Sequence, residues 1–237
     1  MEDGIVDWGF KCSIISLGWA GYSFLFPKRF NLYDFKKERK VRMPFDGCVT
    51  WYDDVCSLID TDFRDVFSGI HTKLDEDGKE IVSTEYSKYN HEQTSNLDDF
   101  KEQMNKRIGQ FNKELQDSII NGNTIIFFLV CQDFPHELVK ILRKKYSNLR
   151  FKIFCLNVRG KRNPNINSEE QKFCKYVHVQ TPSEDYIVFA DYKTEEGREF
   201  EKKILSEFLM FMTELSGKKY DVEKIFSLGT RNYQENL

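Results

Sequence analysis

The chain has 237 residues, which is enough for one large domain or two small ones with a sizeable core. Hydrophobic residues make up 40% and charged residues 31%, which is ordinary for a soluble globular protein, and aromatic residues reach 15% with 21 phenylalanines. A net charge of −3 and a pI of about 5.9 argue against a dedicated nucleic-acid binder, so no nucleic-acid partner is expected.

The N-terminus, the apolar runs and the cysteines bear on localisation and on cofactors. The N-terminus, MEDGIVDWGF, is acidic and lacks the layout of a signal peptide. The longest apolar run, from Ile125 to Cys131, is far shorter than the roughly 20 residues of a membrane helix. Six cysteines are scattered without a CxxC pair or zinc-ligand spacing. We therefore expect a cytoplasmic protein with reduced thiols, no membrane contact, no metal and no cofactor.

The first half of the chain predicts a strand, a helical segment, a hairpin and a long helix. Residues 12–18 form an apolar run that ends at Gly18, and residues 52–67 have helical spacing. Residues 71–89 predict two strands joined at Asp77–Gly78. The long helix is expected to begin near Ser95, with Asp98 completing a capping box, and to end at Asn121–Gly122.

The second half alternates between strands and helices. The predicted elements are a strand at 124–131, a helix at 135–146 with Pro135 in its first turn, strands at 151–158, Tyr176–Gln180 and Tyr186–Ala190, and a helix from Glu195 to Leu215. Apolar strands that alternate with helices favour a parallel sheet covered on both faces. We predict one α/β domain over residues 1–237, with a three-layer, mostly parallel central sheet and a small cap or insertion around residues 40–95.

In such a sheet, ligands bind at the carboxyl ends of the strands. Gln132 and Asp133 follow the second apolar strand, and Asn157 ends the third. These residues are therefore candidates for ligand binding, together with the turn after the first strand. The alternative for Gln132 and Asp133 is that they only cap the helix that follows.

Two further candidates lie on predicted loops. His91 precedes the long helix, beside Asn90 and Glu92 and outside any apolar periodicity, which is typical of a catalytic histidine or of an ordinary surface residue. Asp46 lies in the segment MPFDG. It either bonds nearby amides in a structured turn, or orients a catalytic histidine or holds a substrate.

The order of three motifs resembles a largely bacterial family of uncharacterised proteins that carry the label papain-like cysteine peptidase. The motifs are Ser16-Leu17-Gly18, then Pro44-Phe45-Asp46, then His91 before a helix that contains Arg107-Ile108. The resemblance covers roughly residues 12–160. It implies a hydrolase in which His91 activates a cysteine and Asp46 lies in the site, with Ser16, Gly18 and Gly21 at the rim.

The chain departs from that family at two positions. Gly21 stands where the family has its cysteine, and Gly47 stands where it has a tryptophan after the P-F-D motif. Ser23 and Cys48 are the candidate replacement nucleophiles.

Three functions therefore stay open. The first is a hydrolase or transferase with a Cys/Ser–His arrangement, and the second is a pseudoenzyme that binds a small molecule or peptide on the same fold. The third is a sugar- or nucleotide-handling protein in which the Gly18–Gly21 turn receives a phosphate.

Overall fold

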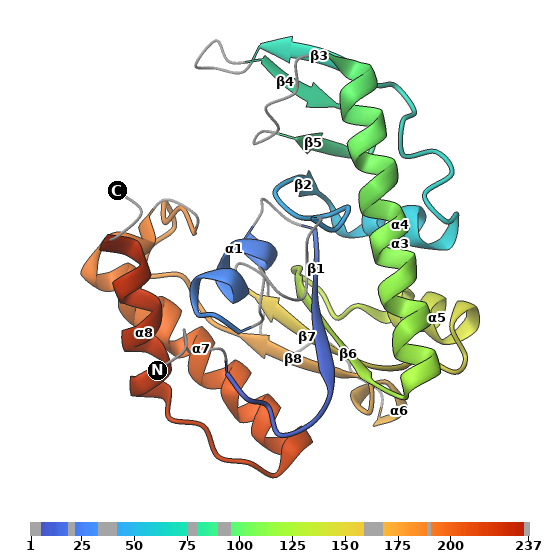
Figure 1. Ribbon diagram of the computed structural model, residues 1–237. Coiled ribbons are helices and arrows are strands. Elements are labelled where there is room, and N and C mark those ends of the chain that lie inside the picture. Colours follow the sequence, from blue (N-terminus) through green and yellow to red (C-terminus); the bar gives the residue numbers. More distant parts are fainter. Residues whose placement is uncertain are drawn as a thin grey trace.

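The structure is a computed structural model that describes residues 6–18, 22–32, 42–74, 80–89, 96–158, 168–188 and 191–234 (Figure 1). Its central element is a four-stranded parallel sheet with strand order β1-β6-β7-β8. The strands are β1 (Cys12–Leu17), β6 (Thr124–Val130), β7 (Arg150–Asn157) and β8 (Cys174–His178). The predicted α/β class with a parallel central sheet is confirmed.

The sheet is buried on both faces, which explains why its strands read as continuous apolar runs. In β6, six of seven residues are buried. Because side chains alternate along a strand, Phe127 and Leu129 enter one core while Phe128 and Val130 enter the other.

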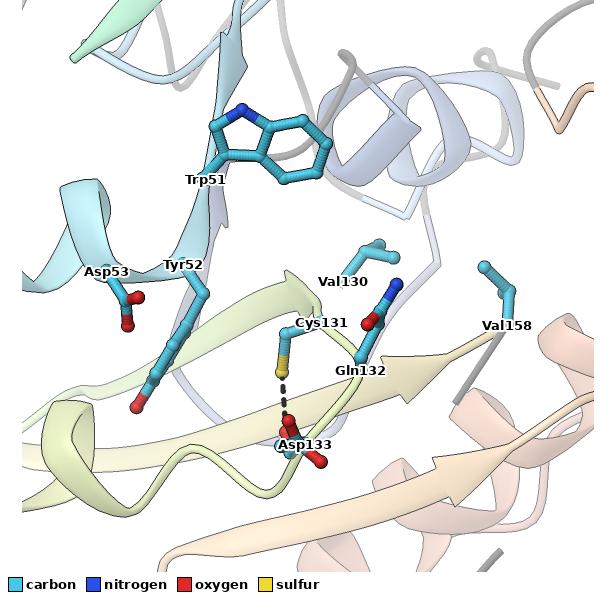
Figure 2. Close-up of a pocket in the computed structure, with 8 residues that line it drawn as sticks. All are labelled: Trp51, Tyr52, Asp53, Val130, Cys131, Gln132, Asp133 and Val158. Carbon is cyan, nitrogen blue, oxygen red and sulfur yellow. Dashed lines mark hydrogen bonds between the residues drawn. The ribbon is translucent and has the colours of Figure 1, made fainter. Parts of the chain in front are cut away.

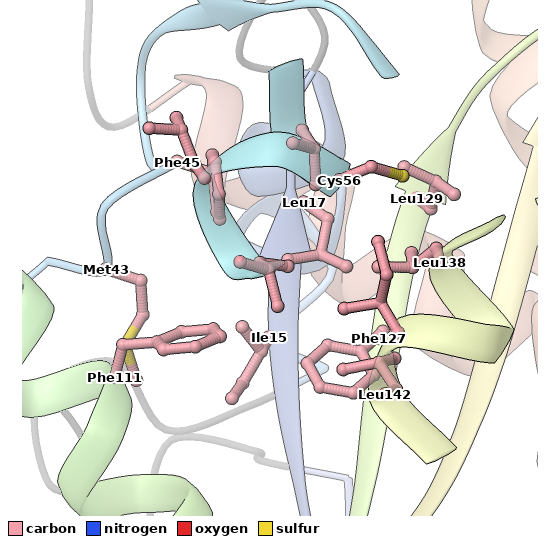
Figure 3. Packing of buried hydrophobic residues seen from close by; sticks show 14 of the residues in the cluster. Ile15, Leu17, Met43, Phe45, Cys56, Phe111, Phe127, Leu129, Leu138 and Leu142 are labelled. Atoms are coloured by element: carbon pink, nitrogen blue, oxygen red, sulfur yellow. The ribbon is translucent and has the colours of Figure 1, made fainter. Parts of the chain in front are cut away.

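Helices cover each face of this sheet. One face carries α3 (Tyr52–Asp60), α4 (Leu97–Asn121) and α5 (His136–Lys145), and the other carries α1 (Tyr22–Arg29), α7 (Glu195–Ser216) and α8 (Val222–Gln234). The short helices α6 (Ser168–Gln171) and η1 (Asp191–Lys193) lie in the connections. Figure 3 shows the first core, where Ile15 and Phe127 of the strands pack beside Phe111 of α4 and Leu142 of α5.

The predicted insertion contains a second, antiparallel sheet with order β2-β5-β4-β3. Its strands are β2 (Val49–Thr50), β3 (His71–Leu74), β4 (Glu80–Ser83) and β5 (Ser87–Tyr89). The helix α4 runs alongside both sheets (Figure 1). Its first turn packs on the small sheet, where the rings of Tyr89 and Phe100 lie 4.7 Å apart.

Two local predictions are corrected. The N-cap of α4 is Asn96, whose side chain accepts a hydrogen bond from the Asp99 amide, one residue later than the predicted capping box; Ser95 lies outside the described residues. Residues 186–188 are not a strand. The Ile187 amide donates a hydrogen bond to the Asp191 carboxylate at 2.6 Å, and the Tyr186 ring packs on Phe200 of α7. The alternating apolar residues of this segment therefore pack in a turn against α7 and do not pair with a strand.

Over the described residues, no helix combines the length and the apolar character needed to cross a membrane.

Candidate functional site

The carboxyl ends of β1, β6 and β7 meet at one edge of the parallel sheet. In register, Leu17 of β1 lies opposite Leu129 of β6, and Val130 lies opposite Leu156 of β7. The residues that follow these positions therefore lie near one another. This edge is where an open α/β sheet places its ligands.

A cavity of about 390 Å³ lies at this edge (Figure 2). It is lined by Trp51, Tyr52, Asp53, Val130, Cys131, Gln132, Asp133 and Val158. Trp51 caps α3, and Tyr52 and Asp53 are its first residues. Val130 ends β6, the next three lining residues follow it, and Val158 follows β7. The Trp51 side chain is 60% exposed, and Asp53, Gln132 and Asp133 are also exposed. None of these eight residues is basic, so Asp53 and Asp133 are the charged groups among the described lining residues.

Buried polar groups behind the cavity fix the loop after β6. The Gln132 carbonyl accepts a hydrogen bond from Asn157 Nδ2 at 2.7 Å and another from the Tyr176 hydroxyl at 2.8 Å. Asn157 is fully buried, and it also bonds the Tyr176 hydroxyl. Partial burial raises the pKa of Tyr176 to about 12, so this phenol remains a donor at neutral pH. Asn157 therefore supports the lining residue Gln132 from behind.

The opposite wall is tied down through Tyr52. Its hydroxyl accepts a hydrogen bond from the Leu138 amide in the first turn of α5, at 3.1 Å. Burial raises the pKa of Tyr52 well above the ordinary value for a phenol, so its hydroxyl stays neutral. This contact joins the start of α3 to the helix that follows the Gln132 loop, so both walls of the cavity are held to each other.

Two predicted site residues, Ser16 and Asp46, meet at a buried junction outside the cavity lining, and a third, Gly18, lies at the end of the same strand. Ser16 of β1 donates a hydrogen bond to Asp46, whose other carboxylate oxygen accepts the Met43 amide at 2.8 Å. Asp46 is fully buried. Gly18 has φ +63°, and a Cβ there would lie 2.8 Å from the Thr50 carbonyl oxygen. Asp46 thus bonds the amide of its own turn and anchors that turn to β1, as the first of its two predicted roles requires. Its second predicted role, orienting a histidine or holding a substrate, stays a prediction.

Both candidate replacement nucleophiles are buried and already hydrogen-bonded. The Ser23 hydroxyl, in the second residue of α1, donates to the Gly18 carbonyl. The Cys48 thiol donates to the Phe45 carbonyl at 3.3 Å and lies 3.1 Å from Thr50 Oγ1. Neither side chain lines the cavity.

His91 and Gly21 lie outside the described residues, so the predicted arrangement around His91 stays a prediction. Gln132 and Asp133 line the cavity, and their predicted part in ligand binding stays a prediction. Three lining residues, Trp51, Tyr52 and Asp53, were not predicted from the sequence. Their signal in the sequence is an aromatic pair followed by acidic residues at the start of a helix.

Comparisons of the chain with known protein families, with curated proteins and with solved structures find no match. Among the described residues, no group of three or more His, Cys, Asp or Glu side chains could hold a metal ion.

Proposed function

We propose that this protein binds a small, uncharged sugar in the cavity at the carboxyl edge of its parallel sheet. One observation carries the proposal: an exposed indole, two carboxylates and an amide share a cavity whose lining, over the residues that the structure describes, includes no base. The cavity, at about 390 Å³, lies near the lower end of the roughly 300–1,000 Å³ typical of ligand pockets.

The lining matches the chemistry of a sugar ring. One face of such a ring carries C–H groups, which pack on an aromatic plane such as Trp51. Its hydroxyl groups donate hydrogen bonds to carboxylates such as Asp53 and Asp133, and the Gln132 amide both donates and accepts. Aromatic surface combined with a few polar groups is typical of small-molecule sites.

The charge of the lining favours a neutral ligand over a nucleotide or a sugar phosphate. A phosphate next to Asp53 or Asp133 would meet a like charge without a compensating base from the other described lining residues. Of the two ligand classes that the sequence left open for a sugar- or nucleotide-handling protein, the uncharged sugar is therefore the better fit.

Binding is also better supported than hydrolysis. Nucleophilic catalysis needs an accessible hydroxyl or thiol next to a base. Ser23 and Cys48 are buried and donate to backbone carbonyls. The carboxyl-edge cavity offers binding groups that do not depend on either residue.

Isothermal titration calorimetry on the full chain tests the proposal. The panel contains neutral mono- and disaccharides, the matching sugar phosphates, nucleotides and cationic amines. We expect saturable binding of at least one neutral sugar. Trp51→Ala should weaken it at least about tenfold, in line with the loss of a central aromatic anchor, and Trp51→Phe should weaken it less.

Ile187→Ala is the matched control, because Ile187 is also an exposed apolar side chain but does not line the cavity. It should leave the affinity unchanged. Binding of nucleotides or cationic amines without any neutral sugar would refute the proposed ligand class, and so would sugar binding that survives Trp51→Ala unaltered.

A further inference from the structure

Two thiols lie in contact beneath the cavity. Cys131, the first residue after β6, and Cys155 of β7 have their Sγ atoms 3.0 Å apart. The Cys131 thiol also donates to the Asp133 carbonyl at 2.9 Å. Among the described residues, the pair belongs to no group of three or more side chains that could hold a metal ion.

The two thiols differ in access. Cys131 is 8% exposed and lines the cavity, whereas Cys155 is completely buried. A small molecule that enters the cavity therefore reaches Cys131 before Cys155. Cys155 also bonds a third thiol, that of Cys174 on β8, which is buried and does not line the cavity. This arrangement is typical of a reacting thiol with a second, resolving thiol behind it.

We propose that Cys131 is a site of oxidation by hydroperoxides and that Cys155 resolves it by forming a reversible disulfide. The Cys131 sulfur attacks the peroxide, the O–O bond breaks, and a sulfenic acid and one molecule of alcohol or water result. The Cys155 sulfur then attacks the sulfenic sulfur. The S–S bond forms, the S–O bond breaks, and hydroxide takes the Cys155 proton and leaves as water.

The register of the strands shows what must move when the disulfide forms. Cys155 lies opposite Leu129, two residues before Cys131. With strands about 4.8 Å apart and a rise of about 3.3 Å per residue, the Cα atoms of the two cysteines are about 8 Å apart. Disulfides need about 4.4–6.8 Å. The disulfide must therefore draw one backbone toward the other by more than about 1 Å.

That movement falls on the loop that lines the cavity. Cys131 lies beyond the last residue of β6, whereas Cys155 is inside β7 and paired on both sides. Because the loop is the freer partner, the disulfide pulls Cys131, Gln132 and Asp133 toward β7. It also removes the Cys131 thiol proton that bonds the Asp133 carbonyl. Oxidation of this pair should thus reshape the cavity, whichever ligand the cavity binds.

Burial limits the speed of the second step. It raises the pKa of the Cys155 thiol well above its ordinary value, because a buried thiolate is poorly solvated. Disulfide formation should therefore accelerate with increasing pH, and the Cys131 sulfenic acid should persist long enough for chemical trapping.

Peptide mapping of the full chain tests the proposal. The reduced protein is treated with hydrogen peroxide, alkylated, and digested with trypsin without reduction. Trypsin separates Cys131, Cys155 and Cys174 into peptides 114–140, 153–159 and 173–175. We expect a cross-linked product of peptides 114–140 and 153–159 that dithiothreitol releases. The number of free thiols should fall by two from the six in the sequence.

Variants assign the two roles. In Cys155→Ala the cross-link should vanish and dimedone should label Cys131, whereas Cys131→Ala should abolish both products. Cys174→Ala is the matched control, because Cys174 is a buried thiol on the neighbouring strand β8 that also bonds Cys155. In this variant the cross-link between Cys131 and Cys155 should persist. Six unmodified thiols after peroxide treatment, or a cross-link from Cys131 or Cys155 to a different cysteine such as Cys174, would overturn the proposal. If a variant fails to fold, the identity of the cross-linked peptides from the unaltered chain still tests the proposed disulfide.

Discussion

At the residue scale, the turn after β1 has the strictest requirement in the site region. Gly18 adopts φ +63°, a conformation that L side chains rarely occupy. A Cβ at this position would also lie 2.8 Å from both the Thr50 carbonyl oxygen and Val55 Cγ2. The glycine therefore lets the end of β1 pack directly against β2 and α3.

We predict that Gly18→Ala lowers the free energy of unfolding by about 1–3 kcal/mol, because it combines backbone strain with overlap. Gly109→Ala is the matched control, since Gly109 lies inside α4 and a Cβ added there would meet no other part of the described chain within 4 Å. It should raise the free energy of unfolding by about 0.5–1 kcal/mol. Urea denaturation measures both changes. Equal effects of the two substitutions would contradict this role of Gly18 in the turn.

The buried bond between Ser16 and Asp46 gives a second prediction at this scale. Asp46→Ala leaves the Ser16 hydroxyl and the Met43 amide without this acceptor, at a cost of about 1–3 kcal/mol for each buried group. A double-mutant cycle with Ser16→Ala should give a coupling energy of about 0.5–3 kcal/mol in urea denaturation. Additive effects would show that the two side chains do not interact.

At the element scale, α4 joins the two sheets. Its Phe100 packs on Tyr89 of the small sheet, and Phe111 packs edge-on against Phe63, 5.4 Å away, in the segment after α3. Farther along, Leu115 enters the core beneath the parallel sheet. The apolar stripe of α4 thus holds the insertion, which supplies Trp51, next to the strands that supply Gln132.

The cap of α4 can be tested by substitution. Asn96→Ala removes the acceptor of the Asp99 amide and should lower the free energy of unfolding by about 1 kcal/mol. Asn105→Ala is the control, since Asn105 is exposed inside the same helix. Because alanine has the higher helix propensity, this substitution should raise the free energy of unfolding by about 0.5 kcal/mol. Thermal unfolding followed by circular dichroism distinguishes the two. A stabilising Asn96→Ala would exclude this cap.

The sequence predicts the elements wherever one local pattern determines them. The uninterrupted apolar run of β6 predicts a strand that is buried on both faces of a sheet, and six of its seven residues are buried. The Asn121–Gly122 pair predicts the end of α4, and Gly122 adopts the left-handed conformation there. The alternation at Tyr186–Val188 misled the prediction, because contacts with Phe200 and Asp191 decide that segment.

The site could be predicted only in part, because some of its residues are placed by contacts between distant parts of the chain. Gln132 and Asp133 follow directly from the rule for strand ends. Trp51 reaches the cavity because β2 pairs with β5, a contact between residues nearly 40 positions apart, at Thr50 and Ser87. No local pattern encodes such a pairing.

At the scale of the whole molecule, buried phenols make the stability depend on pH. Burial raises the pKa of Tyr146, Tyr176 and Tyr186 to about 12, and it also raises the pKa of Tyr22 and Tyr52 well above the ordinary value for a phenol. Between pH 10 and 12 the unfolded chain loses phenolic protons that the folded chain retains. Because the unfolded state then binds fewer protons, stability falls as the pH rises through this range.

We therefore predict that the urea midpoint is independent of tyrosine ionisation below pH 10 and decreases between pH 10 and 12. Absorbance at 295 nm follows tyrosinate directly. At pH 11 the folded protein should show clearly fewer ionised tyrosines than the urea-unfolded chain, which exposes all 11. Identical titration curves for the folded and unfolded chains would contradict the burial of these phenols.

The central claim is that the cavity beside Trp51 holds an uncharged sugar, and indole N–H spectra of the nitrogen-15-labelled protein test it most directly. The chain has three tryptophans, and Trp51→Phe assigns the signal of Trp51. Trp8 serves as the internal reference, because its indole is buried and donates to the Leu32 carbonyl at 3.0 Å. We predict that a neutral sugar shifts the Trp51 signal saturably and leaves that of Trp8 in place. A Trp51 signal that no neutral sugar moves, but that a nucleotide or sugar phosphate does, would contradict the claim.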